Sequence, residues 1–372
     1  MDFYQQYCNV RLRVGPYRKS DDPDLVRAVA AIDALANRAK DVAEGCDHKG
    51  RFGWGGADFS AEALMEKAYI YLEALERGES PLRGMFAEPG GALIDHSFIE
   101  KDGVMHLFYN RGYIGYLWDQ RFVDSIGHAT SRDLLHWDIH PPVLTAEAGG
   151  HDDYQVWSPG VVAYEGRYYM FYTGVNFNIA QAIMVAVSDD LYHWEKISRT
   201  PVWTAGEWCQ WDASRWSDCR DSMVFLDDDG TAYMYYCSSY VGEDGVRRPC
   251  VGAASSRDLL HWEERGFIAI PDVPHNAESP YVLKKDGTYY LFFTNCGVGT
   301  CYATSNHPIT GWSVRPDRGN FIISSGCSEV FRFGDKWYIS LATYQGRGEQ
   351  YLEIAECVWH EDGSVSMGQR VK

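Results

Sequence analysis

The sequence lacks the long apolar runs and the basic character that several classes of protein require. No apolar run approaches the roughly 20 residues that span a bilayer, and the N-terminus, MDFYQQYCNVRLRVG, does not have the pattern of a secretory signal peptide. Lys and Arg number 34 against 52 Asp and Glu, a formal net charge of −18. Because such a chain repels phosphate backbones and anionic lipids, we expect neither nucleic acid nor a membrane as partner. A neutral small molecule or an oligosaccharide is favoured.

The ten cysteines lack the spacing of a metal site. There is no CxxC pair and no Cys/His ligand spacing, so we expect no structural zinc, and no cofactor is predicted. The acidic turn at 227–229 lacks the ligand spacing and the closing Glu of a calcium loop. Reduced thiols in a cytoplasmic protein are the favoured interpretation. Disulfides are the alternative if the protein is exported, because an even count permits them.

Aromatic residues and glycine are abundant. The chain holds 13 Trp, 25 Tyr and 36 Gly, within a globular balance of 45% hydrophobic and 23% charged residues. This mixture is typical of many short strands joined by tight turns, with aromatic side chains available for packing or for a binding surface.

Residues 1–85 differ from the rest of the chain and predict helices. Asp22 and Pro23 are an N-cap and a first-turn proline before LVRAVAAIDALANRAK, whose apolar residues fall on one helical face. A second helix is predicted from the Ser60 cap to Gly78. The glycine-rich stretch 51–56 lacks the Gly-Lys-Ser/Thr ending of a phosphate loop and is interpreted as a turn.

From residue 90 onward the sequence repeats itself. The heptad SRDLLHW stands at 131–137 and again at 256–262, with a related copy at 188–194 and a weaker one at 305–312. Short aromatic strands begin at residues 106, 169, 233, 290 and 338. Repeats of this size, with several short strands each, are typical of propeller blades. We therefore predict an all-β fold, a five-bladed β-propeller over residues 86–372, after an N-terminal helical segment over 1–85.

The repeat phase indicates a site at one end of the propeller. Counting back 11 or 12 residues from each aromatic strand reaches the position that precedes the innermost strand of its blade, which lines the central channel. The residues found there are Asp95, Ser158, Asp221, Glu278 and Cys327. The twelfth residue in the third blade is attributed to its longer turn at 227–230.

Three of these five positions carry carboxyl groups: Asp95, Asp221 and Glu278. Converging carboxylates repel one another and raise at least one pKa, which keeps a carboxyl protonated for general-acid work. A pair of such groups is the basic apparatus of glycoside hydrolysis. Taken singly, each has an ordinary structural explanation, for example Asp221 paired with Arg220. Their shared phase favours catalysis.

Several motifs resemble those of the five-bladed propeller glycosidases of families 32, 68 and 43. Ile94-Asp95 followed by HLFYN resembles the nucleophile-bearing segment of family 32, and the run GHATSRDLLHW at 127–137 resembles a run of that family closely. Arg220-Asp221 is similar to the Arg-Asp-Pro motif, and Glu278-Ser-Pro-Tyr to the acid-bearing segments of families 32 and 43. The stretch 157–159, Trp-Ser-Pro, is similar to the Trp-Ala-Pro of family 43.

This resemblance covers about residues 90–345 and implies roles for the three carboxyl residues. Asp95 would be nucleophile or base, Asp221 the transition-state stabiliser or pKa modulator, and Glu278 the general acid. The neighbours of these residues depart from the family patterns, as at His96, Ser97, Ser222 and Ser279. No carboxylate is lost, so the departures suggest a remote branch with a shifted substrate. The helical segment has no counterpart in the pattern; it could cap the funnel, form an oligomer contact or brace the propeller.

Other side chains are candidates for binding substrate. Arg220 offers fixed donors to sugar hydroxyls, and Ser158 occupies the site phase. Trp118 and Trp157 could stack on a sugar ring, with core packing an equally good explanation. Glu329 is a channel candidate weighed evenly against a strand-edge acid.

The leading hypothesis is a glycoside hydrolase acting on a furanosidic or related bond, with a fructoside slightly preferred over an arabinoside or xyloside. Two alternatives stay open on the same fold. One is a glycosyl transferase or another non-hydrolytic biosynthetic enzyme, and the other is a carbohydrate-binding propeller without catalysis.

Overall fold

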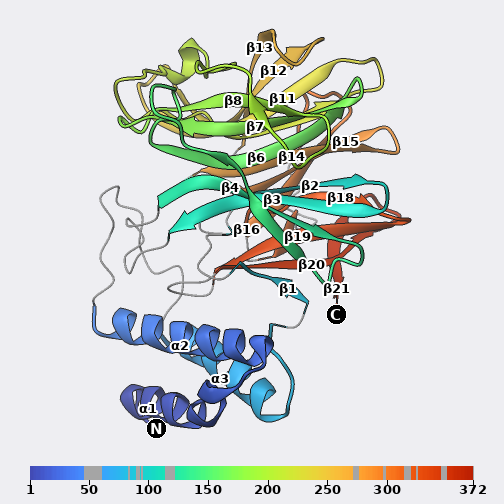
Figure 1. Cartoon of the computed structure of the whole chain (residues 1–372). Helices are drawn as coiled ribbons and strands as arrows, with labels where there is room; N and C mark the ends of the chain where they lie inside the picture. Colours follow the sequence, from blue (N-terminus) through green and yellow to red (C-terminus); the bar gives the residue numbers. More distant parts are fainter. Residues whose placement is uncertain are drawn as a thin grey trace.

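The computed structural model describes most of the chain and places its helices before its strands (Figure 1). The described residues are 1–45, 61–82, 84–88, 93, 95–113, 122–270, 276–295, 299–313, 320–323, 326–344 and 350–371.

The described part of the N-terminal helical segment contains three α-helices and a 3-10 turn: α1 (Phe3–Arg13), η1 (Gly15–Lys19), α2 (Pro23–Ala43) and α3 (Ala61–Glu76). The predicted start of α2 is confirmed, because the Asp22 side chain accepts a hydrogen bond from the Asp24 amide at 2.9 Å. The predicted cap of α3, Ser60, lies outside the described residues. Helix α1 was not predicted. Its signal is the capping box formed by Asp2 and Gln5.

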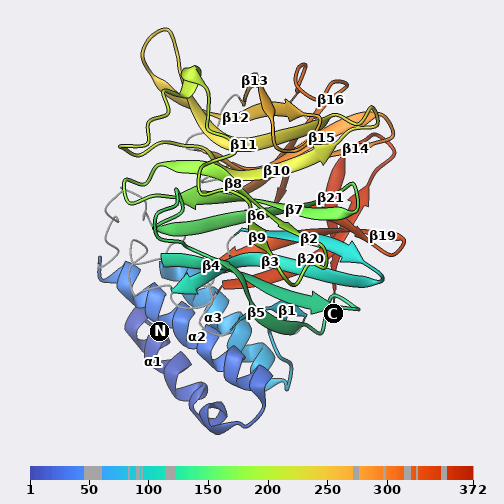
Figure 2. The same ribbon diagram turned by 45° about the horizontal axis from the view of Figure 1, so that its top comes forward.

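The described strands form five sheets, which confirms the predicted five-bladed propeller (Figures 1 and 2). Each sheet contains a four-stranded antiparallel meander whose strands pair in chain order. The blades are, in sequence, β2 (His96–Lys101), β3 (Val104–Tyr113), β4 (Phe122–Ser131) and β5 (Asp138–Thr145); β6 (Gln155–Tyr164), β7 (Arg167–Val175), β8 (Gln181–Ser188) and β9 (Glu195–Lys196); β10 (Arg220–Leu226), β11 (Ala232–Val241), β12 (Arg247–Ser256) and β13 (Trp262–Ala269); β14 (Ala277–Lys285), β15 (Thr288–Asn295), β16 (Gly299–Ser305) and β17 (Phe321–Ile323); and β18 (Val330–Phe333), β19 (Lys336–Tyr344), β20 (Gln350–Trp359) and β21 (Val365–Arg370).

The repeated heptad closes the turn between the third and fourth strands of a blade. In the copy at 256–262, Ser256 Oγ accepts from the Leu259 amide at 2.9 Å, and Asp258 Oδ1 accepts from the His261 amide at 2.8 Å. Trp262 Nε1 donates to the Leu259 carbonyl at 3.0 Å. The copies at 131–137 and 188–194 make the same bonds. The heptad is therefore a structural turn, and its recurrence follows from the recurrence of the blade.

The last blade receives a strand from the start of the propeller. The short strand β1 (Met85–Phe86) pairs with β20 at Leu352 and Glu353, and β21 pairs with the same strand further along. The chain before the first blade is thus hydrogen-bonded to the fifth blade. This pairing of β1, β20 and β21 closes the circle of blades and is called the seam. The Val371 amide donates to the Ile354 carbonyl at 2.9 Å, so the end of the described chain lies beside this seam (Figure 1).

The helices pack against this seam. One buried apolar cluster joins Ile32 and Leu72 of the helices to Phe86, Leu107 and Leu352 of the strands. Figure 2 shows the helices alongside the part of the propeller that contains β3, β5 and β20. The domain boundary predicted at residue 85 stays a prediction, because this cluster continues across it.

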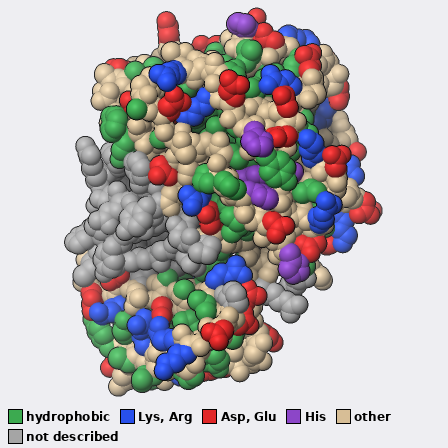
Figure 3. Space-filling view, viewed as in Figure 1, with side chains coloured by type: hydrophobic (Ala, Val, Ile, Leu, Met, Phe, Trp, Pro, Cys, Tyr) green, Lys and Arg blue, Asp and Glu red, His purple; other side chains and the backbone are tan. Residues whose placement is uncertain are grey.

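The surface is mixed in charge. Figure 3 shows acidic and basic side chains interspersed over the face it displays. Among the described residues, the helices are too short or too polar to cross a bilayer.

Candidate active site

The residues at the mouth of the channel share an unusual backbone conformation. Ser158, Asp221, Ser279 and Cys327 have φ values of 49°, 56°, 47° and 54°. Left-handed backbone is costly for residues other than glycine, and it is concentrated at functional sites. Three of these residues lie in bulges where the innermost strand shifts its register against its neighbour, in β6, β10 and β14. The bulge turns the side chain of the bulged residue toward the channel.

These four residues and Asp95, one from the start of each blade, form a ring around the channel, and this ring corrects one part of the sequence prediction. Ser279, and not Glu278, has the left-handed conformation shared by Ser158 and Asp221. In the pairing of β14 with β15, Glu278 lies opposite Thr294, just as Arg220 lies opposite Cys237 in the pairing of β10 with β11. Glu278 therefore corresponds to Arg220, one residue before the ring position. The error arose because a 12-residue count, which only the longer turn of the third blade requires, was also applied to the fourth. Two ring positions, Asp95 and Asp221, therefore carry carboxyl groups, and Glu278 is adjacent to the ring.

A cavity of about 90 Å³ lies at the centre of the blades. Residues from all five blades line it, and they come from the starts of β2, β6, β10 and β14 and from the segment before β18. Asp95, Ser158, Asp221, Ser279 and Glu329 are among them, whereas Glu278, Arg220 and Trp157 are not. The prediction that the phase positions line the channel is confirmed for Asp95, Ser158, Asp221 and Cys327.

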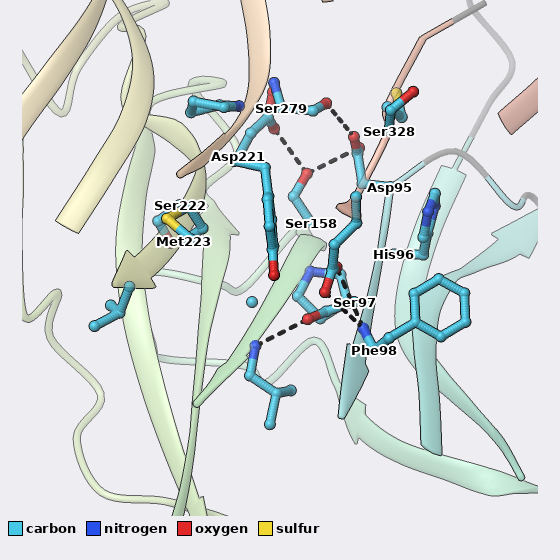
Figure 4. Close-up of a pocket in the computed structure, with 18 residues that line it drawn as sticks. Asp95, His96, Ser97, Phe98, Ser158, Asp221, Ser222, Met223, Ser279 and Ser328 are labelled. Atoms are coloured by element: carbon cyan, nitrogen blue, oxygen red, sulfur yellow. Dashed lines mark hydrogen bonds between the residues drawn. The ribbon is translucent and has the colours of Figure 1, made fainter. Parts of the chain in front are cut away.

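Asp95 is surrounded by hydrogen-bond donors from three blades. Asn110 Nδ2 donates to its Oδ2 at 3.1 Å, and Ser279 Oγ donates to its Oδ1 at 2.8 Å. Ser158 Oγ lies 2.9 Å from Oδ2. Figure 4 shows the Ser158 hydroxyl between the carboxyl groups of Asp95 and Asp221. These contacts fix the orientation of the Asp95 carboxyl group in the mouth of the channel.

Asp221 is more deeply buried, with only 8% of the residue exposed. Its Oδ1 lies 2.7 Å from Ser158 Oγ, and its Oδ2 accepts from the Ser279 amide at 3.2 Å. Burial, together with the negative charge of Asp95, raises the pKa of Asp221 to about 7, against the opposing effect of Arg220. A carboxyl group with such a pKa holds a proton through much of the neutral range, as expected for converging carboxylates.

Arg220 links Glu278 to the rest of the site. The buried guanidinium donates to Glu278 Oε1 at 2.7 Å and to Asp218 Oδ1 at 2.9 Å, and its Nε lies 3.6 Å from Asp221 Oδ2. Gln181 accepts a further bond from Nη1 at 3.1 Å. A planar cation shared in this way holds Glu278 at a fixed position relative to Asp221.

The other predicted residues have varied positions. Glu329 lies in the channel, where its carboxylate accepts from the Phe98 amide at 3.2 Å and burial raises its pKa to about 8. Trp157 is half-buried, and its Nε1 donates to Gln155 Oε1 at 3.0 Å. Trp118 lies outside the described residues.

Sequence reasoning missed the polar side chains that tie one blade to the next. Asn110, Thr173 and Thr294 each lie four residues after the start of an aromatic strand. Each accepts a hydrogen bond from the amide of the ring residue in the following blade, at 2.6, 3.0 and 2.7 Å for Ser158, Asp221 and Cys327. Cys237 stands at this place in the third blade, where the Ser279 amide donates to Asp221 instead. The recurring polar residue at the end of the aromatic strand was the available signal.

Comparison of the sequence with known proteins gives relatives that include a beta-fructofuranosidase and an arabinanase. Beta-fructofuranosidase, insoluble isoenzyme CWINV3, of Arabidopsis thaliana is 27% identical over 201 residues, which cover 50% of this chain and 30% of that protein. Extracellular endo-alpha-(1->5)-L-arabinanase of Thermotoga petrophila is 24% identical over 314 residues, which cover 63% of this chain and 64% of the arabinanase. The matches therefore span less than two thirds of the length of either relative.

Solved structures share the fold. RS223-Beta-xylosidase superposes with a TM-score of 0.60 at 18% identity, over 75% of this chain and 97% of that chain. The GH43_1 enzyme from Xanthomonas citri complexed with xylotriose gives a TM-score of 0.59 at 17% identity, over 79% of this chain and 94% of its own.

The sequence pattern of one family covers the greater part of the chain. The pattern described as Glycosyl hydrolases family 43 matches residues 110–365, from the end of the first aromatic strand into the last blade. The expected relationship to the five-bladed propeller glycosidases is thereby confirmed. The chain belongs to glycosyl hydrolases family 43, a family of glycoside hydrolases.

Proposed function

We propose that the protein hydrolyses a furanosidic or related glycosidic bond, with a fructoside slightly preferred over an arabinoside or xyloside. The observation that carries the proposal is the convergence of Asp95, Asp221 and Glu278 from three blades, linked through Ser158 and Arg220. Glycoside hydrolysis needs one carboxyl group to protonate the leaving oxygen and a second to act as nucleophile or as base for water.

Each carboxyl residue has a role that its surroundings support. Glu278, whose side chain is 22% exposed at the edge of the ring, is the general acid. Asp95, surrounded by donors, is the nucleophile or base. Asp221 is buried between them and adjusts the charge of the site. Because the guanidinium of Arg220 is directed to protein carboxylates, its proposed role is to orient Glu278 rather than to bind a sugar hydroxyl.

The fructoside preference has support from sequence rather than from fold. The run at 127–137 resembles family 32, and a relative named as a beta-fructofuranosidase matches half of the chain. The arabinanase relative supports the wider furanoside class. The location stays a proposal as well: we favour the cytoplasm, with the eight described cysteines all outside disulfides.

The test is an activity assay on fructosides, arabinosides and xylosides with the wild type and the variants Glu278→Gln and Asp95→Asn. Each variant is expected to lose about 10²- to 10⁴-fold in kcat, the usual contribution of acid–base catalysis. The loss in Glu278→Gln should be smaller for substrates with good leaving groups, which need less protonation. Asp212→Asn, which changes a partly exposed loop carboxylate away from the cavity, is the control. Undiminished turnover in Glu278→Gln or Asp95→Asn would remove the residue assignment.

Transfer to an acceptor sugar is the second candidate reaction. A relative named 6(G)-fructosyltransferase, from Asparagus officinalis, is 37% identical over 90 residues. Product analysis decides between the two reactions. Free monosaccharide supports hydrolysis, whereas lengthened oligosaccharides without release of the transferred sugar support transfer.

A further inference from the structure

The Ser158 hydroxyl lies between two carboxyl groups but has only one hydrogen to donate. Its Oγ is 2.7 Å from Asp221 Oδ1 and 2.9 Å from Asp95 Oδ2 (Figure 4). A serine hydroxyl offers one donor and two acceptor positions. If both carboxyl groups were ionised, one contact would set lone pairs against each other at hydrogen-bond distance. A second proton therefore lies on one of the two carboxyl groups.

The contacts of Asp95 identify it as the ionised partner. The Ser158 amide donates to Asn110 Oδ1 at 2.6 Å, which fixes the orientation of the Asn110 amide and directs its Nδ2 to Asp95 Oδ2. Ser279 Oγ donates to the other oxygen of Asp95. With Ser158, Asp95 has three donors, and an ionised carboxylate is an acceptor only.

Asp221 is correspondingly the protonated partner. Its Oδ2 accepts from the Ser279 amide, which leaves Oδ1, directed at Ser158, to carry the proton. Burial and the charge of Asp95 favour the neutral form of Asp221 and raise its pKa. In this arrangement Asp221 donates to Ser158 Oγ, and Ser158 donates to Asp95 Oδ2.

We propose that Ser158 makes Asp95 and Asp221 a pair that shares a single proton, with the proton on Asp221 and the negative charge on Asp95. Ser158 is a positioning residue, and it stands where the Trp-Ala-Pro motif has an alanine. The catalytic consequence rests on the proposed function, but the protonation of the pair does not. Further titratable side chains face the pair from β10, β11, β14 and the segment before β18: Arg220, Cys237, Glu278 and Cys327.

The Ser158 hydroxyl favours the state in which the pair of carboxyl groups holds one proton over the states in which it holds none or two. It can accept from one carboxyl group and donate to the other only when one of them is protonated and the other ionised. The two titration steps of the pair are thereby moved apart. Asp221 therefore keeps its proton to higher pH than it would without the hydroxyl.

The test compares Ser158→Ala with Ser279→Ala, the matched removal of another hydroxyl from Asp95. The two titration steps are measured without substrate, by infrared and carbon NMR spectroscopy of the carboxyl groups, with Asp221→Asn to assign the protonated band. In Ser158→Ala the lower titration step should move to higher pH and the upper step to lower pH, each by about one pH unit. In Ser279→Ala only the lower step should rise, because the Ser279 amide still bonds Asp221.

Two results would overturn the proposal. One is that both titration steps of Ser158→Ala stay at the pH of the wild type. The other is that the wild type shows, at pH 5 to 6, no protonated carboxyl band that disappears in Asp221→Asn. Ser158→Gly provides a second removal of the hydroxyl if the alanine variant does not fold, since glycine adopts positive φ readily. If the expected titration appears but none of the glycosides is turned over, the shared proton stands and the proposed function fails. Where turnover is found, the acid limb of kcat/KM should move up with the lower step in both variants.

Discussion

At the scale of the residue, the Asp218 carboxylate compensates the positive charge of Arg220, which is hydrogen-bonded to Glu278. This carboxylate is buried and receives Arg220 Nη1 at 2.9 Å, Ser239 Oγ at 2.8 Å and Trp216 Nε1 at 3.1 Å. Burial alone would raise the pKa of Asp218, but Arg220 and these hydrogen bonds hold it below its ordinary value. Asp218 therefore stays ionised and neutralises part of the positive charge that Glu278 experiences.

Asp218→Asn should accordingly change the pH dependence of the reaction. The variant keeps an oxygen acceptor for Arg220 but removes the compensating negative charge, which favours the ionised form of Glu278, the proposed general acid. The alkaline limb of kcat/KM should move down by about one pH unit. Asp212→Asn, in the same loop, should leave the profile unchanged. An unaltered alkaline limb in Asp218→Asn would show that Asp218 has only a structural role.

The residues of the site were predicted unevenly, for identifiable reasons. Asp95 and Asp221 could be found because the repeat phase marks the ring. Glu278 was assigned to that phase through a counting error of one residue, although its contact with Arg220 brings it to the same site. Ser279 stands where a count of 11 residues from the fourth aromatic strand leads, so the repeat phase could have found it. Asp218 could not be found, because its importance arises from its contacts with Arg220 and Ser239, which no repeat marks.

At the scale of the element, the repeated heptad is a unit of stability. Asp133 of the first copy accepts from the Leu135 and His136 amides at 2.9 and 2.8 Å and contacts His136 Nδ1 at 2.7 Å. Burial opposes ionisation, but these hydrogen bonds hold the pKa of Asp133 below its ordinary value. The carboxylate thus contributes stability above its unfolded pKa, about 3.9, and that contribution is lost as the pH falls below it.

Asp133→Ala should lower the free energy of unfolding by about 1 kcal/mol at neutral pH, like the loss of a helix cap. Urea unfolding at neutral pH and at about pH 3 measures the effect, and the difference from the wild type should shrink at the lower pH. Arg132→Ala, which removes an exposed side chain of the same turn, is the control. A difference that grew on acidification would contradict the assignment.

Elements with a repeat or a clear apolar face could be predicted, and those without either could not. The blades recur, so their strands were found from the aromatic pattern. The pairing of β1 with β20 joins two residues to a strand far along the chain, and nothing in either segment specifies the other. Helix α1 buries only Val10 and therefore shows little apolar periodicity.

At the scale of the whole molecule, the helices and the propeller share a core. Leu72 of α3 is fully buried in the cluster that includes Phe86 and Leu352 at the ring closure. A substitution that disrupts the packing of the helices therefore also disrupts the packing at the seam of the propeller. This supports the bracing role among the three roles open to the helical segment.

Leu72→Ala should lower the free energy of unfolding by about 2 to 5 kcal/mol, in one transition for the entire protein. Circular dichroism of the helices and tryptophan fluorescence of the blades should give coincident unfolding curves in both wild type and variant. Ile70→Ala, at a residue 57% exposed on the same helix, should change little. Separate transitions, with only the helical one shifted, would show that the helices are an independent unit.

The seam also has a consequence for rearranging the chain. Gly84 lies against Val371, so closely that a Cβ at Gly84 would be 2.5 Å from the Val371 carbonyl oxygen. The beginning and the end of the propeller segment are therefore neighbours, and a short linker could join the two if residues 1–83, which share the core at this seam, were supplied as a separate chain. Circular permutants could then open the chain at the exposed turn of another blade, such as Asp286-Gly287, while every pair of strands keeps its partner.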